Sequence, residues 1–223
     1  MRYGTCLEVL FCNFVMVRVK ICGITNLEDA RLAARFGADA LGFNFYEKSV
    51  RFVTPIAAAE LIKELGEPID KVGVFVNHSI DDVVNAVELA SLDTVQLHGD
   101  ESPRFVADLR ARCGCRIVKA LRVSPDFNHS ESIEYDADGI LLDGYSTTVR
   151  GGTGETFDWE VAKNVSTLIP QLWLAGGLTP ENVRLAVTEV TPYAVDACSS
   201  LESSPGVKDA EKLERFISEA KGQ

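Results

Sequence analysis

The feature that most constrains this chain is an alternation of short apolar, β-branched runs with amphipathic stretches along almost its whole length. Each short run predicts a β-strand, because β-branched side chains fit the pleated surface of a sheet. The predicted strands are Val17–Cys22, Ala40–Phe45, Lys71–Val76, Thr94–Leu97, Arg116–Leu121, Gly139–Leu142, Leu172–Ala175 and Ala194–Asp196. No change of composition between them indicates a linker.

The stretches between the strands have helical periodicity, and residues suited to helix ends flank them. The predicted helices are Leu27–Phe36, Ile56–Leu65, Ile80–Ala90, Pro103–Arg112, Trp159–Asn164, Pro180–Val190 and Asp209–Lys221. The predicted end residues are Asn26, Ser79, Ser102 and Thr179 as N-caps, Pro103 and Pro180 at the first helical position, and Gly37 at a helix end. Ser130–Tyr135 is the weakest helix, so we expect the fifth crossover to be irregular.

Strands that alternate with helices pair in parallel, because parallel neighbours need a crossover connection. An open, doubly wound sheet and a closed barrel both satisfy this rule. The open sheet more often has a glycine fingerprint after its first strand, whereas the glycine-rich turns of this chain come late. The sequence therefore predicts an α/β fold: a single (β/α)8 TIM barrel with eight parallel strands.

The length of 223 residues suits one large domain. We expect residues 16–223 to form the barrel, which is the catalytic domain. Residues 1–15 form an N-terminal extension of doubtful status, because Glu8 and Asn13 interrupt an apolar stretch too short for a signal peptide. Met16, which precedes the first clear strand, is the expected biological start.

The formal net charge is −11, with 33 acidic and 22 basic residues. An acidic chain argues against nucleic-acid or anionic-membrane partners, and no apolar run is long enough to span a membrane. The six cysteines are too sparse for a disulfide scaffold, and Cys113-Gly114-Cys115 is too tight for a Cys-x-x-Cys pair. We expect most of them to be reduced, buried side chains in a cytoplasmic protein.

Active sites of (β/α)8 barrels lie at the carboxyl ends of the strands. Alternation along the first strand directs Lys20 and Cys22 into the barrel. A thiol there can act as a base when nearby cations lower its pKa, although an inert cysteine is the simpler interpretation. Asp143 directly follows the predicted sixth strand, where a partly buried carboxyl suits general-acid chemistry as well as it suits a turn.

Two late segments have the character of anion-binding loops. Gly176-Gly177 follows the seventh strand, and Cys198-Ser199-Ser200 follows the eighth. Loops in these two positions commonly bind phosphate through backbone N–H groups. A third glycine-rich stretch, residues 150–156, is interpreted as a lid or substrate loop.

Several motifs occur in the order in which phosphoribosylanthranilate isomerases have them. They are Val19–Thr25, Gly42–Tyr46 with Ser49–Phe52, Val72–Asn77, Val95–Gly99, Leu141–Asp143, Gly152–Gly154 with Phe157–Trp159, Ala175–Leu178, and Val195–Glu202 with Pro205–Asp209. The chain therefore resembles that family from Met16 to its C-terminus.

This resemblance implies a cofactor-free, metal-free barrel enzyme of tryptophan biosynthesis. Its reaction is the Amadori rearrangement of N-(5-phosphoribosyl)anthranilate to 1-(2-carboxyphenylamino)-1-deoxyribulose 5-phosphate. By motif, Cys22 is the general base, Asp143 the general acid and Arg51 the partner of the anthranilate carboxylate. By the same resemblance, the phosphate group of the substrate is bound by Gly176, Gly177, Ser199 and Ser200.

One departure from the family pattern weakens the last assignment. Ala197-Cys198-Ser199-Ser200-Leu201 lacks the glycine that usually follows the serine pair, so Ser199 and Ser200 are less secure than Cys22 or Asp143. Three roles are open for Asp196: contact with the substrate, orientation of the loop after the eighth strand, or a structural role in the barrel interior. For Gln96 and His98 we expect a supporting or core role, with a neutral, packed histidine.

Two other functions remain open. One is a catalytically inactive barrel that binds sugar phosphates; the other is a related phosphoribosyl aminoaldose isomerase of histidine biosynthesis. Retention of Cys22 and Asp143 disfavours the first, and a cysteine in place of an aspartate disfavours the second. A metal-dependent epimerase is less favoured, because His78, His98 and His129 form no ligand cluster in the sequence. The expected partner is a small substrate with phosphate and carboxylate groups, and the expected state is a monomer or homodimer.

Overall fold

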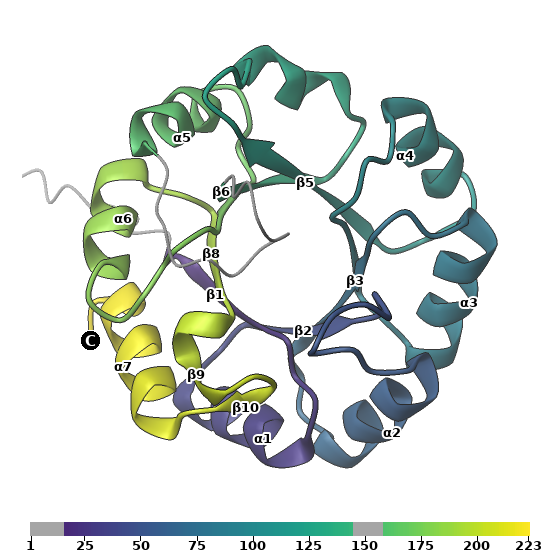
Figure 1. Cartoon of the computed structure of the whole chain (residues 1–223), viewed down its shortest axis with the longest axis vertical. Helices are drawn as coiled ribbons and strands as arrows, with labels where there is room; N and C mark the ends of the chain where they lie inside the picture. The colour runs from purple at the N-terminus through teal and green to yellow at the C-terminus, as the bar shows by residue number, and fades with distance from the viewer. Residues whose placement is uncertain (1–15, 145–157) are drawn as a thin grey trace, which may run out of the picture.

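The computed structural model describes residues 16–144 and 158–223. Within these ranges, eight parallel strands pair in sequence order and close into a barrel, as Figure 1 shows. They are β1 (Arg18–Cys22), β2 (Ala40–Asn44), β3 (Asp70–Phe75), β4 (Thr94–Leu97), β5 (Arg116–Val123), β6 (Gly139–Gly144), β7 (Leu172–Leu174) and β8 (Ala194–Ala197). The predicted fold class is confirmed.

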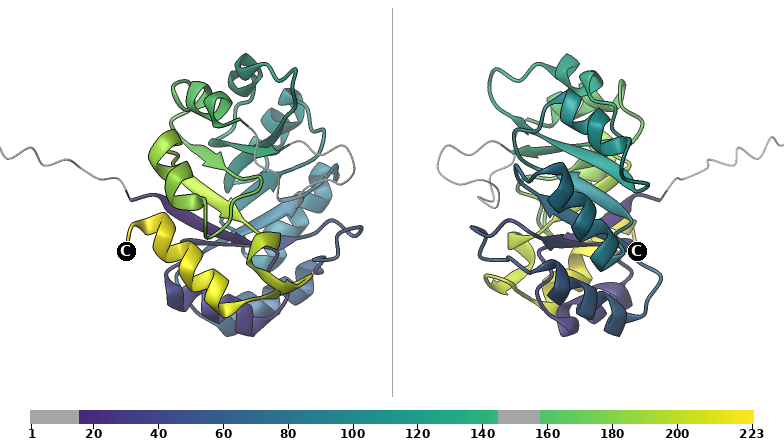
Figure 2. Two further views of the ribbon diagram at one scale, coloured as in Figure 1. Left: turned by 60° about the vertical axis from the view of Figure 1, so that its left-hand side comes forward. Right: turned by 90° about the vertical axis from the view of Figure 1, so that its right-hand side faces the viewer.

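A ring of helices surrounds the barrel (Figures 1 and 2). It consists of α1 (Leu27–Phe36), α2 (Pro55–Leu65), α3 (Ile80–Ala90), α4 (Pro103–Arg110), the 3-10 helix η1 (His129–Glu134), α5 (Trp159–Ser166), α6 (Val183–Val190) and α7 (Ala210–Lys221). The C-terminal helix α7 packs beside α1, which closes the ring. A short 3-10 helix replaces an α-helix in the fifth crossover, where the periodicity is weakest.

Local side-chain chemistry accounts for most helix ends. The side chains of Asn26, Ser79 and Ser102 accept hydrogen bonds from backbone N–H groups three residues later. Such bonds satisfy donors that the first turn of a helix leaves free. Gly37 ends α1 in the left-handed conformation, with φ at 96°. These four predicted end residues are confirmed.

The predicted start of α6 is wrong. The helix begins at Val183 rather than Pro180, and its N-cap position is Asn182 rather than Thr179. The Asn182 side chain accepts a hydrogen bond from the N–H of Thr179 and donates one to the carbonyl of Gly177. These bonds hold residues 179–182 as a turn against the end of β7, so the helix starts after it.

A small hairpin follows β8 and was not predicted. The 3-10 helix η2 (Ser199–Leu201) leads into β9 (Glu202–Ser204), which pairs antiparallel with β10 (Val207–Lys208). Gly206 has φ at 82°, a conformation that glycine adopts without steric cost. Strands this short have almost no periodicity in the sequence. The hairpin folds back toward the carboxyl end of the barrel (Figure 1).

The barrel separates two apolar regions. The larger one fills the layer between sheet and helices and includes Val19 and Ile21 of β1, both fully buried. The smaller one lies inside the barrel and includes Val118, Leu141 and Trp173. Lys20 lies between Val19 and Ile21 in the chain and points inward instead. The predicted alternation along β1 is thus observed, and it directs polar side chains to the interior.

The remaining expectations concern the N-terminal extension, the glycine-rich loop after the sixth strand, the cysteines and membrane-spanning segments. The N-terminal extension, residues 1–15, and the predicted lid, residues 150–156, lie outside the described residues. Cys113 and Cys115 form a disulfide, so the expectation of reduced cysteines is wrong for this pair. Among the described residues, no helix has the length and apolar character needed to cross a membrane.

Candidate active site

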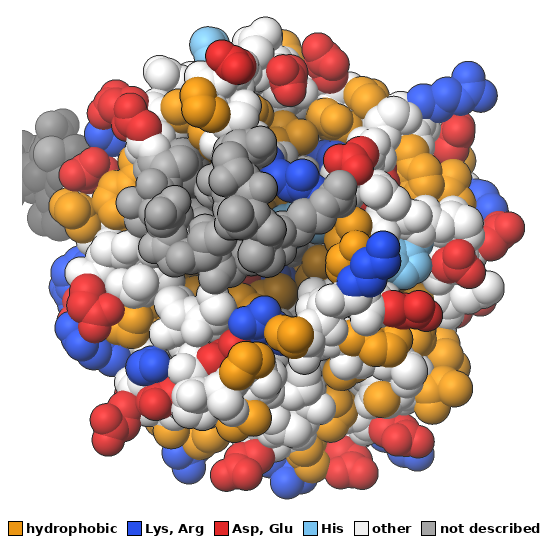
Figure 3. Space-filling view, in the orientation of Figure 1, with side chains coloured by type: hydrophobic (Ala, Val, Ile, Leu, Met, Phe, Trp, Pro, Cys, Tyr) orange, Lys and Arg blue, Asp and Glu red, His pale blue; other side chains and the backbone are white. Residues whose placement is uncertain are grey.

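A cavity of about 480 Å³ opens at the carboxyl ends of the strands. Figure 3 looks onto this end, where basic side chains border a hollow near the centre of the molecule. The cavity brings together residues from the ends of most strands. The predicted site residues that line it are Cys22, Arg51, Asp143, Gly176, Gly177, Asp196 and Ser199. Ser200 is the one predicted residue that is not part of the lining.

Cys22, the last residue of β1, occupies space that a glycine on the next strand leaves open. A Cβ atom at Gly42 would lie 2.8 Å from the Cys22 sulfur. The pKa of the Cys22 thiol is held well below its ordinary value, first by a hydrogen bond from Cys198 and then by Lys20 and Lys208, against the effect of burial. This shift of the pKa favours the thiolate form of Cys22, which is the nucleophilic and basic form of the side chain.

Lys20 and Asp196 form an ion pair inside the barrel beneath Cys22. Lys20 Nζ lies 2.9 Å from Asp196 Oδ1, and the lysine side chain is fully buried. Burial lowers the pKa of Lys20, but the charges of Asp196 and Cys22 outweigh it and raise the value. Burial raises the pKa of Asp196 to about 7, and the charges of Cys22 and Asp143 add to this effect, whereas the ammonium group of Lys20 opposes it. Asp196 thus has a protein partner, as the barrel-interior interpretation expects.

Asp143 ends the buried part of β6 and has a histidine partner from β4. Its Oδ2 atom lies 3.2 Å from His98 Nε2, while His98 Nδ1 lies 2.9 Å from Gln96 Nε2. With the Gln96 amide as donor, Nδ1 accepts and the ring proton is on Nε2, facing the carboxylate. His98 therefore orients the predicted acid directly. The sequence signal that could have indicated this role is the position of His98, two residues after Gln96 and just beyond the end of a predicted strand.

Arg51, from the loop after β2, is already paired with a protein carboxylate. Its Nε and Nη2 atoms each lie 2.7 Å from an oxygen of Glu202. Lys208 Nζ, which is buried, lies 3.1 Å from Glu202 Oε1. The bidentate pair leaves the Nη1 edge of the guanidinium for another acceptor. Glu202 and Lys208 stand in the motifs that carry the resemblance, but sequence reasoning assigned no role to either.

The two predicted anion-binding loops lie side by side at this end. Gly176 and Gly177 have φ at 78° and 69°, and a Cβ atom at Gly176 would lie 2.2 Å from the backbone nitrogen of Gly144. Within the described residues, the N–H groups of these glycines donate to no protein acceptor. The Ser200 hydroxyl donates to the carbonyl of Leu178 at 2.6 Å. Ser200 therefore joins the two loops rather than facing the cavity.

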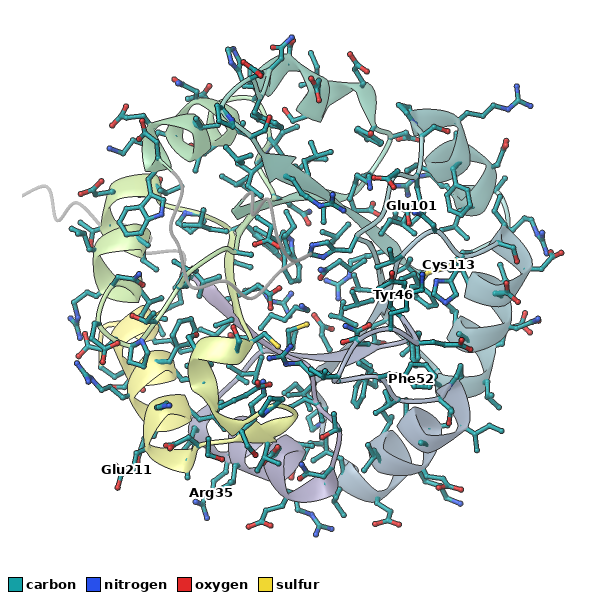
Figure 4. All side chains as sticks on the ribbon, in the orientation of Figure 1. Arg35, Tyr46, Phe52, Glu101, Cys113 and Glu211 are labelled. Carbon is teal, nitrogen blue, oxygen red and sulfur yellow. A yellow bond between two sulfur atoms is a disulfide. The ribbon has the colours of Figure 1, made fainter. Side chains whose placement is uncertain are left out.

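A further part of the lining comes from the loop after β2 and from β3. Tyr46 is among these residues, with Val74 and Val76 contributing apolar surface. Figure 4 shows Tyr46 inside the ring of helices, whereas Arg35 and Glu211 lie on the outer rim. The cavity thus combines apolar and aromatic surface with the basic side chains of Lys48 and Arg51 and with the N–H groups of the two glycines.

A parallel barrel with a thiolate, a histidine-bound carboxyl and free N–H groups at one mouth defines the class of (β/α)8-barrel enzymes that bind phosphorylated substrates. The profile of one family in that class, described as N-(5'phosphoribosyl)anthranilate (PRA) isomerase, matches residues 19–219. The chain belongs to this isomerase family.

Individual relatives agree with the family match. The isomerase of Geobacter sulfurreducens is 49% identical over 207 residues, which cover 93% of this chain and all of that protein. The crystal structure of phosphoribosyl anthranilate isomerase from Thermotoga maritima has 40% identity and a TM-score of 0.86, and covers 93% of this chain and 100% of that one. A related structure, with 39% identity, a TM-score of 0.82 and the same coverage, is a complex with reduced 1-(o-carboxyphenylamino)-1-deoxyribulose 5-phosphate.

Proposed function

We propose that this protein catalyses the Amadori rearrangement of N-(5-phosphoribosyl)anthranilate to 1-(2-carboxyphenylamino)-1-deoxyribulose 5-phosphate, a step of tryptophan biosynthesis. Membership of the isomerase family supports the reaction, and the product-like ligand of a relative supports the substrate. The observation that carries the proposal is that Cys22 and Asp143 line the same cavity. The lowered pKa of Cys22 favours its thiolate form, and His98 orients the carboxyl group of Asp143.

In this proposal Asp143 is the general acid. It protonates the ring oxygen of the ribose as the bond from that oxygen to C1′ breaks, and the anthranilate nitrogen forms a Schiff base with C1′. The hydrogen bond between His98 and Asp143 keeps the carboxyl group at one position in the cavity. Such fixed placement of the acid is worth more to the rate than its intrinsic acidity alone.

Cys22 is the general base of the second step. The thiolate removes the proton from C2′, and the electrons of that C–H bond move toward the Schiff-base nitrogen to form an enolamine. Tautomerisation of the enolamine then gives the ketone. Lys20, buried below the thiolate, balances its charge before the proton arrives. The proton transfers require side chains alone, so the proposal invokes no cofactor or metal.

Substrate binding is assigned to the two sides of the cavity. The N–H groups of Gly176 and Gly177, with Ser199, hold the phosphate, and Ser200 supports them by tying the two loops together. The Nη1 edge of Arg51 meets the anthranilate carboxylate, while Glu202 holds the other edge. Asp196 acts on the substrate indirectly, through Lys20.

Other parts of the proposal concern the whole protein. Residues 16–223 form the catalytic domain, residues 1–15 are an extension that the reaction does not need, and the protein works in the cytoplasm as a monomer or homodimer. A relative from Thermotoga maritima is dimeric, with monomers generated from it. Removal of residues 1–15 tests the domain assignment: unchanged turnover supports it, and a large loss contradicts it.

The decisive experiment is a turnover assay with freshly generated N-(5-phosphoribosyl)anthranilate. The wild-type protein should convert it, whereas Cys22→Ala and Asp143→Asn should each lower kcat at least about 100-fold, as expected for loss of a positioned base or acid. Thr94→Val is the matched control, because it removes a buried hydroxyl at the opposite end of the barrel that has no hydrogen-bond partner. Absence of wild-type turnover would favour the inactive barrel. Turnover confined to a phosphoribosyl aminoaldose of histidine biosynthesis would favour the related isomerase.

A further inference from the structure

A buried ion pair lies beside the active-site cavity, and the mechanism above gives it no role. Lys119 of β5 and Glu101, from the loop between β4 and α4, bring Nζ within 2.9 Å of Oε2, and each side chain is only 2% exposed. Neither residue is part of the cavity lining. Figure 4 shows Glu101 inside the ring of helices, near α4. Apolar side chains often stabilise a fold as well as a buried ion pair does, so stability alone does not account for this one.

We propose that Lys119 and Glu101 are positioning residues for His98: together they fix the backbone on both sides of this histidine and so hold its ring against Asp143. This inference rests on the proposed function, because it assumes that Asp143 is the general acid. It extends the site to two residues that the sequence reasoning and the mechanism left without a role.

Lys119 holds the carbonyl groups on either side of His98. It stands in register with Leu97, the last residue of β4. Its Nζ atom donates to the carbonyl of Leu97 at 3.3 Å and to that of Gly99 at 2.8 Å. The carboxylate of Glu101 is the third acceptor, at 2.9 Å, so each of the three ammonium protons has a partner.

Glu101 holds the N–H group that follows His98. Its Oε2 atom accepts from the N–H of Gly99 at 3.0 Å, and its Oε1 atom accepts from the N–H of Asn77 at 2.8 Å. A Cβ atom at Gly99 would lie 2.6 Å from Glu101 Oε1 and 2.3 Å from Asn77 Oδ1, so the close approach requires a glycine. One carboxylate thus ties the loop after β4 to the loop after β3.

These contacts leave the backbone of His98 little freedom to move. Its own N–H group donates to the carbonyl of Phe75 at 2.8 Å, and the ion pair holds the peptide groups before and after it. From this fixed position the ring reaches Gln96 with Nδ1 and Asp143 with Nε2. A shift of the backbone would move the ring away from the carboxyl group, and catalysis is sensitive to such displacements.

A double-mutant cycle tests whether the ion pair acts through His98. Lys119→Met/Glu101→Gln removes both charges, so that neither is left buried without a partner. It should lower kcat about tenfold with KM changed less than about threefold, because the acid is displaced while binding is kept. The same double substitution in the His98→Ala background should lower kcat less than about twofold, because no ring remains to be positioned. Lys119→Met alone should show the same pattern, and it replaces the double variant if that variant does not fold.

Lys221→Met is the matched control. It removes a mostly buried lysine whose Nζ lies 2.9 Å from Asp39 Oδ2, at the amino end of the barrel, and it should leave kcat unchanged in both backgrounds. Equal losses of kcat with and without His98 overturn the proposal, because they indicate a general structural effect. An unchanged kcat in the wild-type background overturns it as well.

A second measurement is independent of turnover. The nitrogen NMR signals of the His98 ring are assigned by their absence in His98→Ala. In the wild type the two ring nitrogens should have widely separated chemical shifts, since one carries the proton and the other does not. In Lys119→Met/Glu101→Gln the two shifts should move toward each other, because a ring that is no longer held exchanges between tautomers.

Ring signals that are the same in this variant as in the wild type overturn the proposal and leave the proposed function untouched. If the wild type does not turn over the substrate but the ring signals move as expected, the proposed function is wrong, and the effect of the ion pair on His98 stands.

Discussion

His98 Nε2 contacts Asp143 Oδ2 at 3.2 Å, across the mouth of the barrel from β4 to β6. Gln96 lies below His98 on the same strand and fixes the other ring nitrogen at 2.9 Å. A side chain that need not touch the substrate thus sets the position of the proposed acid. The arrangement resembles the orienting partners that many catalytic residues require.

Loss of this contact should affect the chemical step more than binding. His98→Ala is expected to lower kcat about 10- to 100-fold with KM changed less than about threefold, because a displaced acid protonates the substrate inefficiently. His98→Gln can still present an N–H group and should be the milder of the two. Steady-state kinetics separates the two parameters. If KM rises as steeply as kcat falls, His98 contacts the substrate instead.

The carboxylate of Glu202 should be necessary for stability because Lys208 is fully buried beside it. Glu202→Gln is expected to lower the free energy of unfolding by about 3 kcal/mol, since it leaves a buried ammonium without its counter-charge. The double variant Glu202→Gln/Lys208→Met should regain at least half of that loss. Urea unfolding of the wild type, both single variants and the double variant measures the coupling. Additive losses would show that the pair is not the cause.

Asp196 should make stability depend on pH. Its pKa is raised from 3.8 to about 7 in the folded protein, mainly by burial, so the folded state binds a proton that the unfolded state has released. The stability that this group contributes is therefore fully present below about pH 4 and is lost as the pH rises through 7. Relative to Asp196→Asn, the wild type should lose stability across this window. Chemical unfolding at several pH values checks it, with the exposed Asp126→Asn as control; parallel curves would contradict the expectation.

Gly176 should tolerate no side chain. Gly176→Ala adds a Cβ atom 2.2 Å from the Gly144 nitrogen at a φ of +78°, whereas Gly66→Ala meets the same left-handed conformation with nothing within 4 Å. The Gly66 variant should cost about 1 kcal/mol, the usual cost of that conformation, and the Gly176 variant at least about 3 kcal/mol. Thermal unfolding gives both values. Equal losses would mean that the backbone moves to admit the methyl group.

Gly176→Ala should also weaken inhibition by inorganic phosphate, if the loop binds the substrate's phosphate as proposed. Gly66→Ala lies far along the chain, at the end of α2, and should leave the inhibition constant unchanged. Competition kinetics on the folded fraction of each variant provides the comparison. Unchanged inhibition in Gly176→Ala would place the phosphate elsewhere.

The barrel was predictable because each strand and helix carries a local signal. The alternation of Lys20 with Val19 and Ile21 indicates which side chains face inward, and Asn26 and Gly37 mark both ends of α1. The error at Pro180 has a physical cause. Thr179 and Pro180 suit a helix start locally, but the side chain of Asn182 is engaged by the preceding turn, and sequence periodicity does not register that contact.

The lining of the cavity was predictable from the sequence, but the pairings among its side chains were not. Cys22, Asp143 and Gly176 stand at strand ends, and strand ends meet at the mouth of a barrel. The partner of each charge depends on register between strands and on a hairpin too short for a pattern. Arg51 pairs with Glu202 from that hairpin, over a separation of 151 residues. The resemblance to the family indicated Arg51 as a site residue, whereas its pairing with Glu202 is visible only in the folded structure.

Three lysines, Lys20, Lys119 and Lys208, are withdrawn into the interior, each beside a carboxylate that cancels its charge. They contribute little to the field that an approaching molecule feels. The net charge of −11 repels the proposed substrate, which carries a phosphate and a carboxylate, at long range. Dissolved salt shortens the reach of that repulsion to about 10 Å at 0.1 M ionic strength. Capture of the substrate should therefore become faster as salt is added to a dilute buffer, the reverse of what electrostatically steered enzymes do.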